Sequence, residues 1–88
     1  MLENLIIHNE KIVCPRCDGN GLLYQTTLKP INHTIIMCDE CDAIWPTNIQ
    51  SITKSNFEDF TTYVQSRGYA YNDIDLININ YNWFINKV

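Results

Sequence analysis

Apolar residues form β-prone runs in the first half of the chain. β-branched and aromatic residues dominate residues 22–28 and 33–37, and the short segment between these runs contains Pro30. Such residues favour strands and proline favours a turn, so the pattern predicts an antiparallel hairpin. Two shorter β-prone runs, 5–8 and 11–13, precede it and are separated by a predicted turn.

The apolar spacing becomes helical in the second half of the chain. Three apolar residues recur at intervals of three and four: Phe57, Phe60 and Val64. Ser55 and Glu58 have the spacing of a capping box, in which each side chain bonds the backbone N–H of the other residue. Gly68 is the type of residue that ends a helix. The pattern therefore predicts a helix over about 56–67.

The last part of the chain alternates between apolar and polar residues. The apolar positions are Ile77, Ile79, Tyr81, Trp83 and Ile85, and asparagine occupies most positions between them. A period of two predicts a strand over about 77–85, with one apolar face and one asparagine face. We expect this strand to pair with the sheet of the first half while the helix covers one face. The expected fold class is α+β, in a single domain over residues 1–88.

The four cysteines form two Cys-x-x-Cys pairs, Cys14 with Cys17 and Cys38 with Cys41. A two-residue gap directs both thiolates at one ion, and the segment between the pairs is long enough to form a hairpin that brings them together. An all-thiolate site favours Zn²⁺. We therefore predict a structural zinc ion bound by all four cysteines. Two disulfides, a redox dithiol and an iron centre with the same ligands are the alternatives.

Catalytic function is not expected from this sequence. Four thiolates complete a tetrahedral shell and leave no open position for water or substrate. His8 and His33 are not needed as ligands, since the cysteines already supply four. The sequence contains no evident Ser-His-Asp spacing and no glycine-rich phosphate loop. The prediction is a protein that is not an enzyme.

The cysteine pattern resembles that of a zinc ribbon, in which two metal-binding turns, or knuckles, lie at the ends of small antiparallel hairpins. The resemblance covers roughly residues 13–45 and implies a ribbon over about 11–46. The first knuckle, Cys14 to Gly21, also resembles the C-x-x-C-x-G-x-G unit of the DnaJ-type chaperone zinc domain. The second knuckle lacks both glycines, so a DnaJ-like substrate-binding role is not expected.

A second resemblance is to small acidic immunity proteins of bacterial contact-dependent inhibition and Rhs toxin systems. It is carried by the C-x-R-C-D-G-N-G knuckle, the C-D-E-C-D-A-x-W knuckle and residues 56–63. The resemblance implies a protein that binds and neutralises a toxin. It implies no catalytic residues.

Composition bears on the partner and the compartment. The chain has 88 residues, a net charge of −4 and a pI of about 4.8. A domain this short often needs a metal, disulfides or a partner for stability. Acidity argues against general nucleic-acid binding, which depends on lysine and arginine. The sequence shows neither a long apolar run nor the basic start of a signal peptide, so we expect a cytoplasmic protein that does not bind membranes.

Acidic residues flank the cysteines at Asp18, Asp39, Glu40 and Asp42. Exposed turns are often charged, which is the simplest explanation. The functional hypothesis is an acidic surface for a basic partner, such as a nuclease-type toxin. Its proposed contact residues are Asp39, Glu40, Asp42 and Trp45. The alternative is a zinc-ribbon module of transcription or translation that contacts nucleic acid through Arg16, Lys29 and Lys54.

Overall fold

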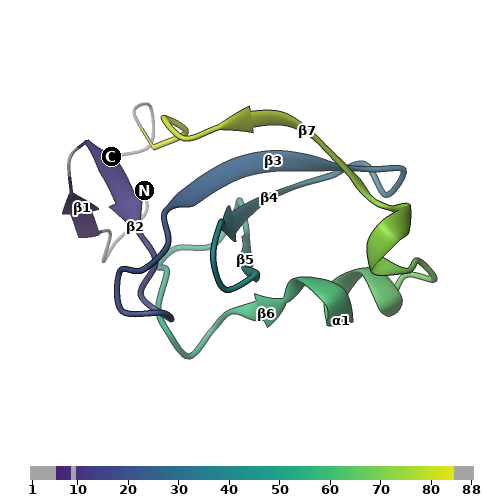
Figure 1. Ribbon diagram of the computed structural model, residues 1–88, viewed down its shortest axis with the longest axis horizontal. Coiled ribbons are helices and arrows are strands. Elements are labelled where there is room, and N and C mark those ends of the chain that lie inside the picture. Colours follow the sequence, from purple (N-terminus) through teal and green to yellow (C-terminus); the bar gives the residue numbers. More distant parts are fainter. Residues whose placement is uncertain (1–5, 9, 85–88) are drawn as a thin grey trace.

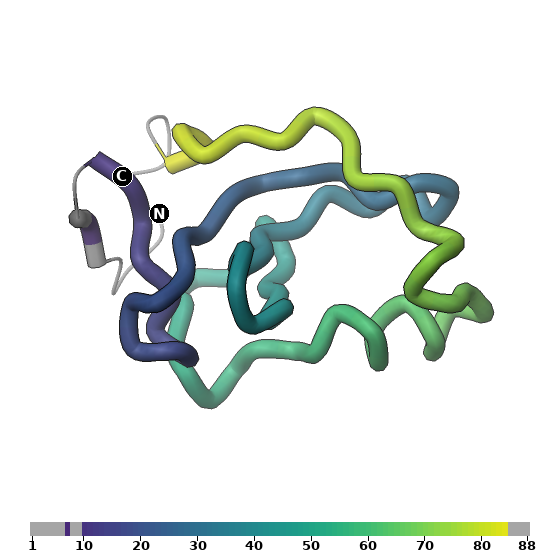
Figure 2. Tube along the Cα trace, viewed as in Figure 1, coloured from purple at the N-terminus to yellow at the C-terminus, as the bar shows by residue number. Residues whose placement is uncertain are grey.

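The structure is a computed structural model that describes residues 6–8 and 10–84 (Figure 1, Figure 2). It is mostly antiparallel β-sheet with one short helix, as the sequence predicted. In chain order, its elements are β1 (Ile6–His8), β2 (Lys11–Val13), β3 (Leu23–Lys29), β4 (His33–Cys38), β5 (Ala43–Pro46), β6 (Glu58–Asp59), α1 (Phe60–Gln65), a 3₁₀ turn η1 (Tyr71–Asp73) and β7 (Asp75–Asn80). In the described part of the chain, no helix is long and apolar enough to cross a lipid bilayer.

Five strands form one antiparallel sheet in the order β6-β5-β4-β3-β7, and β1 pairs with β2 in a separate hairpin (Figure 1). The predicted hairpin over 22–37 is confirmed, because β3 and β4 pair from Leu23 opposite Cys38 to Leu28 opposite His33. β5 then returns along β4. The loop from β2 to β3 carries the first cysteine pair, and the connection from β4 to β5 carries the second. This is the arrangement expected of a ribbon over 11–46.

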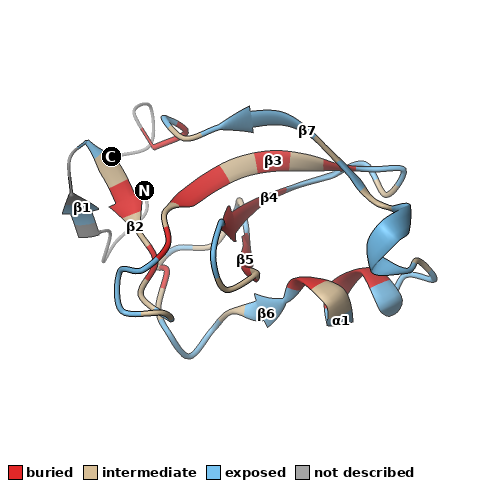
Figure 3. Cartoon of the chain, in the orientation of Figure 1, coloured by how far each residue is buried: buried red, intermediate tan, exposed pale blue. Residues whose placement is uncertain are grey.

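Alternate residues of a strand point to opposite faces of the sheet, and each face here carries its own buried cluster. Much of the buried part of the chain lies on β3, β4 and β5 and along α1 (Figure 3). The first cluster, which we call the cysteine-side core, comprises Ile12, Cys14, Leu23, Ile36, Cys38, Ala43, Trp45, Ile52, Trp83 and Phe84. The second, the helix-side core, comprises Tyr24, Leu28, Ile35, Met37, Ile44, Phe60, Tyr63 and Val64. As expected, the helix covers one face of the sheet.

The predicted start of the helix is wrong. α1 begins at Phe60, and Asp59 caps it by accepting a hydrogen bond from the Thr62 backbone N–H at 3.1 Å. Glu58 instead lies in β6, opposite Ile44 of β5. The capping box is therefore not formed, because the backbone of Glu58 and Asp59 pairs with β5 instead of forming the first helical turn. Tertiary hydrogen bonds overrode the local helix signal.

The predicted end of the last strand is also wrong. β7 covers Asp75–Asn80, and residues 81–84 form a turn instead of continuing the strand. Trp83 and Phe84 leave the strand to pack into the cysteine-side core. Ile85, the last residue of the predicted strand, lies outside the described residues. The strand does pair with β3, as expected.

A bulge explains why the expected apolar face of β7 is not buried. Asn78 has a left-handed φ of 56°, and the pairing with β3 shifts register at this point. Leu76 and Tyr81, five residues apart, consequently both pack against the helix-side core. Ile77 and Ile79 remain 36% and 53% exposed on the edge strand.

Candidate metal centre

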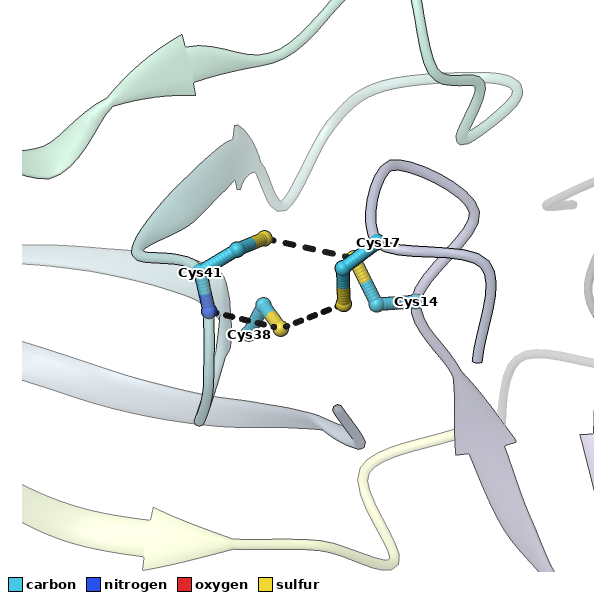
Figure 4. Close-up of side chains that lie close together, drawn as sticks. All are labelled: Cys14, Cys17, Cys38 and Cys41. Carbon is cyan, nitrogen blue, oxygen red and sulfur yellow. Dashed lines mark hydrogen bonds between the residues drawn. The ribbon is translucent and has the colours of Figure 1, made fainter. Parts of the chain in front are cut away.

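The four cysteine side chains meet at one point between the two knuckles (Figure 4). Their Sγ atoms all lie within 4.8 Å of one another. The Cys14–Cys41 and Cys17–Cys38 sulfur pairs are each 3.7 Å apart. A tetrahedral zinc ion with Zn–S bonds of about 2.3 Å places its sulfurs about 3.8 Å apart. The cluster therefore fits a tetrahedral metal ion, and all four predicted ligands are brought together.

The first knuckle is held by backbone hydrogen bonds within the loop. The Gly19 N–H donates to the Cys14 carbonyl at 3.0 Å, and the Asn20 N–H donates to the Cys17 carbonyl at 3.1 Å. The Cys14 N–H donates in turn to the Gly21 carbonyl at 3.0 Å. Gly19 has a φ of 84°, in the left-handed region that favours glycine. The loop is thus wound tightly around its own cysteines.

Gly21 is required for a steric reason. A Cβ atom added at Gly21 would lie 2.3 Å from the Sγ of Cys38 and 3.0 Å from the Cβ of Glu40. The first knuckle can approach the second only because this position has no side chain. Sequence reasoning noted the glycine as part of a motif but did not identify the sulfur that it contacts.

The second knuckle is held by the β4–β5 connection. The Glu40 and Cys41 backbone N–H groups both donate to the Cys38 Sγ at 3.4 Å. The residue after the second cysteine is an aspartate in both knuckles, and both have positive φ: 53° for Asp18 and 60° for Asp42. Aspartate tolerates this conformation better than most residues. The repeated Cys-Asp dipeptide is a sequence signal of knuckle geometry that reasoning from charge alone overlooked.

Arg16 connects the two knuckles. Its Nη1 donates to the Cys41 carbonyl at 2.8 Å, and its guanidinium lies 4.5 Å from the centre of the Phe57 ring.

The two lysines proposed for nucleic-acid contact lie in different surroundings. The Lys29 ammonium donates to the Asn32 side-chain oxygen. Lys54 lies at a shallow hollow of about 370 Å³ that Asp18 and Gly19 also line. Two of the three cations proposed for nucleic-acid contact therefore have partners within the domain.

Burial disfavours ionisation of two of the cysteines when no cation is present. Desolvation raises the pKa of Cys14 to about 11 and also raises the pKa of Cys38. Cys41 is partly desolvated too, but the Ala43 N–H and hydrogen bonds from Cys38, Cys14 and Arg16 outweigh this effect and lower its pKa. A thiophilic cation would have to displace protons from the buried thiols, so its binding releases protons.

Asp39 has a structural role that the sequence did not reveal. Its Oδ1 accepts from the Leu22 backbone N–H at 2.9 Å, and its Oδ2 accepts from the Tyr81 hydroxyl at 3.0 Å. Burial, and then the Asp39 carboxylate, raise the pKa of Tyr81. Asp39 therefore fastens the second knuckle to the start of β3 and to the segment that follows β7.

Trp45 is buried, which contradicts the prediction that it contacts a partner. Its side chain is 0% exposed, and its Nε1–H donates to the Asn56 Oδ1 at 2.7 Å and to the Thr53 carbonyl at 3.2 Å. Among the other proposed contact residues, Glu40 is exposed and Asp42 is half-buried. The indole fills the cysteine-side core, so it is a packing residue.

The chain was compared with protein-family models, curated proteins and solved structures, and none of these comparisons found a match.

Proposed function

We propose that the chain is a non-catalytic zinc-binding domain in which Zn²⁺ joins the two knuckles. The observation that carries the proposal is the convergence of four sulfurs, with two sulfur–sulfur distances of 3.7 Å that match the edge of a zinc tetrathiolate tetrahedron. Because all four positions are filled by protein ligands, the ion holds the fold and offers no site for a substrate.

The metal proposal is tested on the purified protein by elemental analysis and by replacing the metal with cobalt(II). We expect one zinc per chain and the visible absorption of tetrahedral thiolate-bound cobalt. Replacing Cys14 by serine removes one ligand and is expected to change the cobalt spectrum. A protein that contains neither zinc nor cobalt after reconstitution contradicts the proposal, and one that carries iron as isolated supports the alternative of an iron centre with the same four ligands.

We further propose that the domain acts by binding a basic protein, in its most specific form as an immunity protein that covers a nuclease-type toxin in the cytoplasm. Acidic residues of three segments support this: Asp18 of the first knuckle, Glu40 of the second, and Glu58 of β6, all exposed. A zinc tetrathiolate adds a net charge of −2 to the same end of the molecule. The nearby Arg16 bonds to a carbonyl and lies over a ring instead of pairing with a carboxylate. Its charge and that of Lys54, which lines the same hollow as Asp18, offset part of the negative charge of this region.

Co-expression with the product of the adjacent upstream gene tests the immunity proposal. We expect the neighbour alone to stop growth, and this chain to restore growth and to co-purify with the neighbour. Asp39 is a poor choice for charge reversal because it holds the fold. The better variant combines Glu40→Lys with Glu58→Lys, which is expected to weaken the complex and reduce its salt dependence.

Asp75→Lys is the control at a distant site. It changes the net charge by +2, as Glu40→Lys and Glu58→Lys each do alone, so it is compared with these single variants as well as with the double variant. Asp75 is exposed and lies opposite Lys29 in the pairing of β7 with β3. At the other end of β3, Leu23 lies opposite the metal-ligand candidate Cys38 of β4. Six residues along β3 place Asp75 about 20 Å from the centre. Equal binding by both variants and the wild type contradicts the acidic interface, and a harmless neighbour contradicts the immunity role. Strong, salt-sensitive binding to DNA or RNA instead supports the nucleic-acid alternative.

A further inference from the structure

Asn20 occupies a chemically reactive position in the first knuckle. It is the only asparagine in the chain that is followed by glycine. Because glycine has no side chain, its backbone nitrogen can approach the carboxamide of the preceding residue with little steric hindrance. Asn20 is also exposed to water.

The cysteine cluster requires the glycine of this pair. Any side chain at position 21 collides with the Sγ of Cys38, since even a Cβ lies only 2.3 Å away. The glycine therefore cannot be exchanged for a residue that hinders the reaction without disturbing the cysteine cluster.

In the described part of the chain, the side-chain amide of Asn20 is not held by a hydrogen bond, whereas those of several other asparagines are. Asn56 accepts from the Trp45 indole, Asn82 accepts from Lys11, and Asn80 accepts from the Asn82 backbone N–H. Within the described residues, Asn20 bonds through its backbone N–H to the Cys17 carbonyl, and its carboxamide makes no hydrogen bond. The carboxamide is free to turn towards the following nitrogen.

We propose that Asn20 is a deamidation site that opens when the metal is lost. The Gly21 backbone nitrogen forms a bond to the side-chain Cγ of Asn20. The side-chain nitrogen leaves as ammonia, with the proton of the Gly21 N–H balancing the step, and a five-membered imide remains. Water then opens the imide at either carbonyl and leaves aspartate or isoaspartate at position 20.

The bound metal opposes the first step. Ring closure requires rotation of the backbone around Asn20, but the N–H of Asn20 is bonded to Cys17 and the carbonyl of Gly21 is bonded to Cys14. Both partners are metal ligands, so a bound ion holds both ends of the dipeptide. This inference rests on the metal-binding part of the proposed function. When the ion is lost, these two cysteines are no longer linked to the second knuckle, and the loop can open.

The product prevents the metal from returning. Isoaspartate inserts an extra carbon into the backbone of a loop whose hydrogen bonds are closely spaced. It also places a new carboxylate in the knuckle, where a zinc tetrathiolate already carries a net charge of −2. Isoaspartate formation at this position converts a reversible loss of metal into a permanent one.

The test compares cobalt-loaded and chelator-treated protein that is aged in the same mildly alkaline buffer. Peptide mapping by mass spectrometry follows deamidation at each asparagine, and enzymatic methylation detects isoaspartate. We expect Asn20 to react about tenfold faster or more in the metal-free protein, because the reaction requires local opening of the knuckle. The other asparagines are expected to remain intact and serve as controls within the same sample.

Metal rebinding provides the second measurement. Aged metal-free protein is expected to lose the cobalt spectrum in proportion to its isoaspartate content, whereas Asn20→Ala and Asn20→Gln are expected to recover it. Equal rates in loaded and metal-free protein, or reaction mainly at another asparagine, overturn the inference. A normal cobalt spectrum with an inert Asn20 contradicts only this inference, but failure of fresh protein to bind cobalt contradicts the proposed function itself.

Discussion

The two faces of the sheet are closed in different ways. The helix-side core is covered by regular structure, since α1 contributes Phe60, Tyr63 and Val64. The cysteine-side core is covered by Ile12 from a three-residue strand and by residues from loops and turns, among them Ile52 and Trp83. Loops supply little cohesion of their own, so under the proposed function a metal ion bound by the four cysteines takes the place of a helix on that face.

The aromatic residues are divided between the faces in a way that makes the comparison measurable. Both tryptophans, Trp45 and Trp83, are buried in the cysteine-side core. The tyrosines lie in the helix-side core or pack against its members: Tyr24, Tyr63, Tyr69, Tyr71 and Tyr81. Tryptophan fluorescence therefore reports on the cysteine-side core. Tyrosine absorption reports mainly on the helix-side core, with the exception of Tyr81, whose hydroxyl is bonded to Asp39 of the second knuckle.

Removal of the metal has the largest expected effect. Binding of structural zinc to small domains contributes about 10–16 kcal/mol at neutral pH, so its loss is expected to loosen the whole cysteine-side core. Tryptophan emission should shift to longer wavelength, and amides of β2, the knuckles and residues 81–84 should lose protection from hydrogen exchange. Amides of β3 and β4 should stay protected. If amides next to both cores lose protection equally, the metal stabilises both faces of the sheet alike and the proposed difference between them is wrong.

Two glycine substitutions compare the faces directly. Gly21→Ala forces a Cβ against the Cys38 sulfur, and overpacking of about 1–3 kcal/mol corresponds to about 5- to 150-fold weaker metal binding. Gly68 has a φ of 89° and no heavy atom within 4 Å of an added Cβ. Gly68→Ala should lower the free energy of unfolding by about 1–2 kcal/mol without changing metal affinity. Cobalt titration and thermal unfolding measure the two effects, and similar metal affinities for both variants exclude the steric role of Gly21.

Two tyrosine hydroxyls provide a smaller matched pair. Tyr81 donates to Asp39 between the second pair of cysteines, and the Tyr63 hydroxyl is bonded to His33 Nδ1 at 2.7 Å. Replacing either tyrosine by phenylalanine should cost about 0.5–1.5 kcal/mol of stability. Tyr81→Phe should also weaken metal binding and change the emission of Trp83, and Tyr63→Phe should do neither. If Tyr63→Phe also weakens metal binding, the faces are coupled more strongly than their contacts indicate.

The smallest expected effect is a loss of helix-side stability at alkaline pH. Burial, followed by the charges of Tyr81 and Asp39, raises the pKa of Tyr24 from 10.0 to about 12. The pKa of Tyr24 is higher in the folded protein than in the unfolded chain. The neutral side chain therefore contributes its full stabilisation below pH 10, and this contribution is lost as the pH rises towards 12. Tyr24→Phe should reduce this alkaline loss in denaturant titrations of the metal-loaded protein. An unchanged pH dependence in the variant means that another group causes the loss.

Two predictions failed where local signals met tertiary contacts. The Ser55–Glu58 capping box had the right spacing, but Glu58 pairs with β5 and Asp59 caps the helix instead. The alternation after residue 77 was a real period of two, but the bulge at Asn78 interrupts it and residues 81–84 leave the strand. In the first case, pairing with β5 replaced the predicted first turn of the helix. In the second, burial of Trp83 and Phe84 in the cysteine-side core replaced continuation of the strand.

The amino-acid sequence by itself determined the four-cysteine cluster that could hold a metal ion, the central hairpin and the presence of one helix, though not where that helix begins. These features depend on spacing within one segment or on the preference of thiolates for a tetrahedral ion, and neither requires knowledge of distant contacts. Only the tertiary structure decided that Trp45 is buried, that Asp39 holds Tyr81, and that Gly21 must pass the Cys38 sulfur. Each of these contacts joins residues that are brought together by the folded sheet, and no local pattern encodes which partner such a residue will meet.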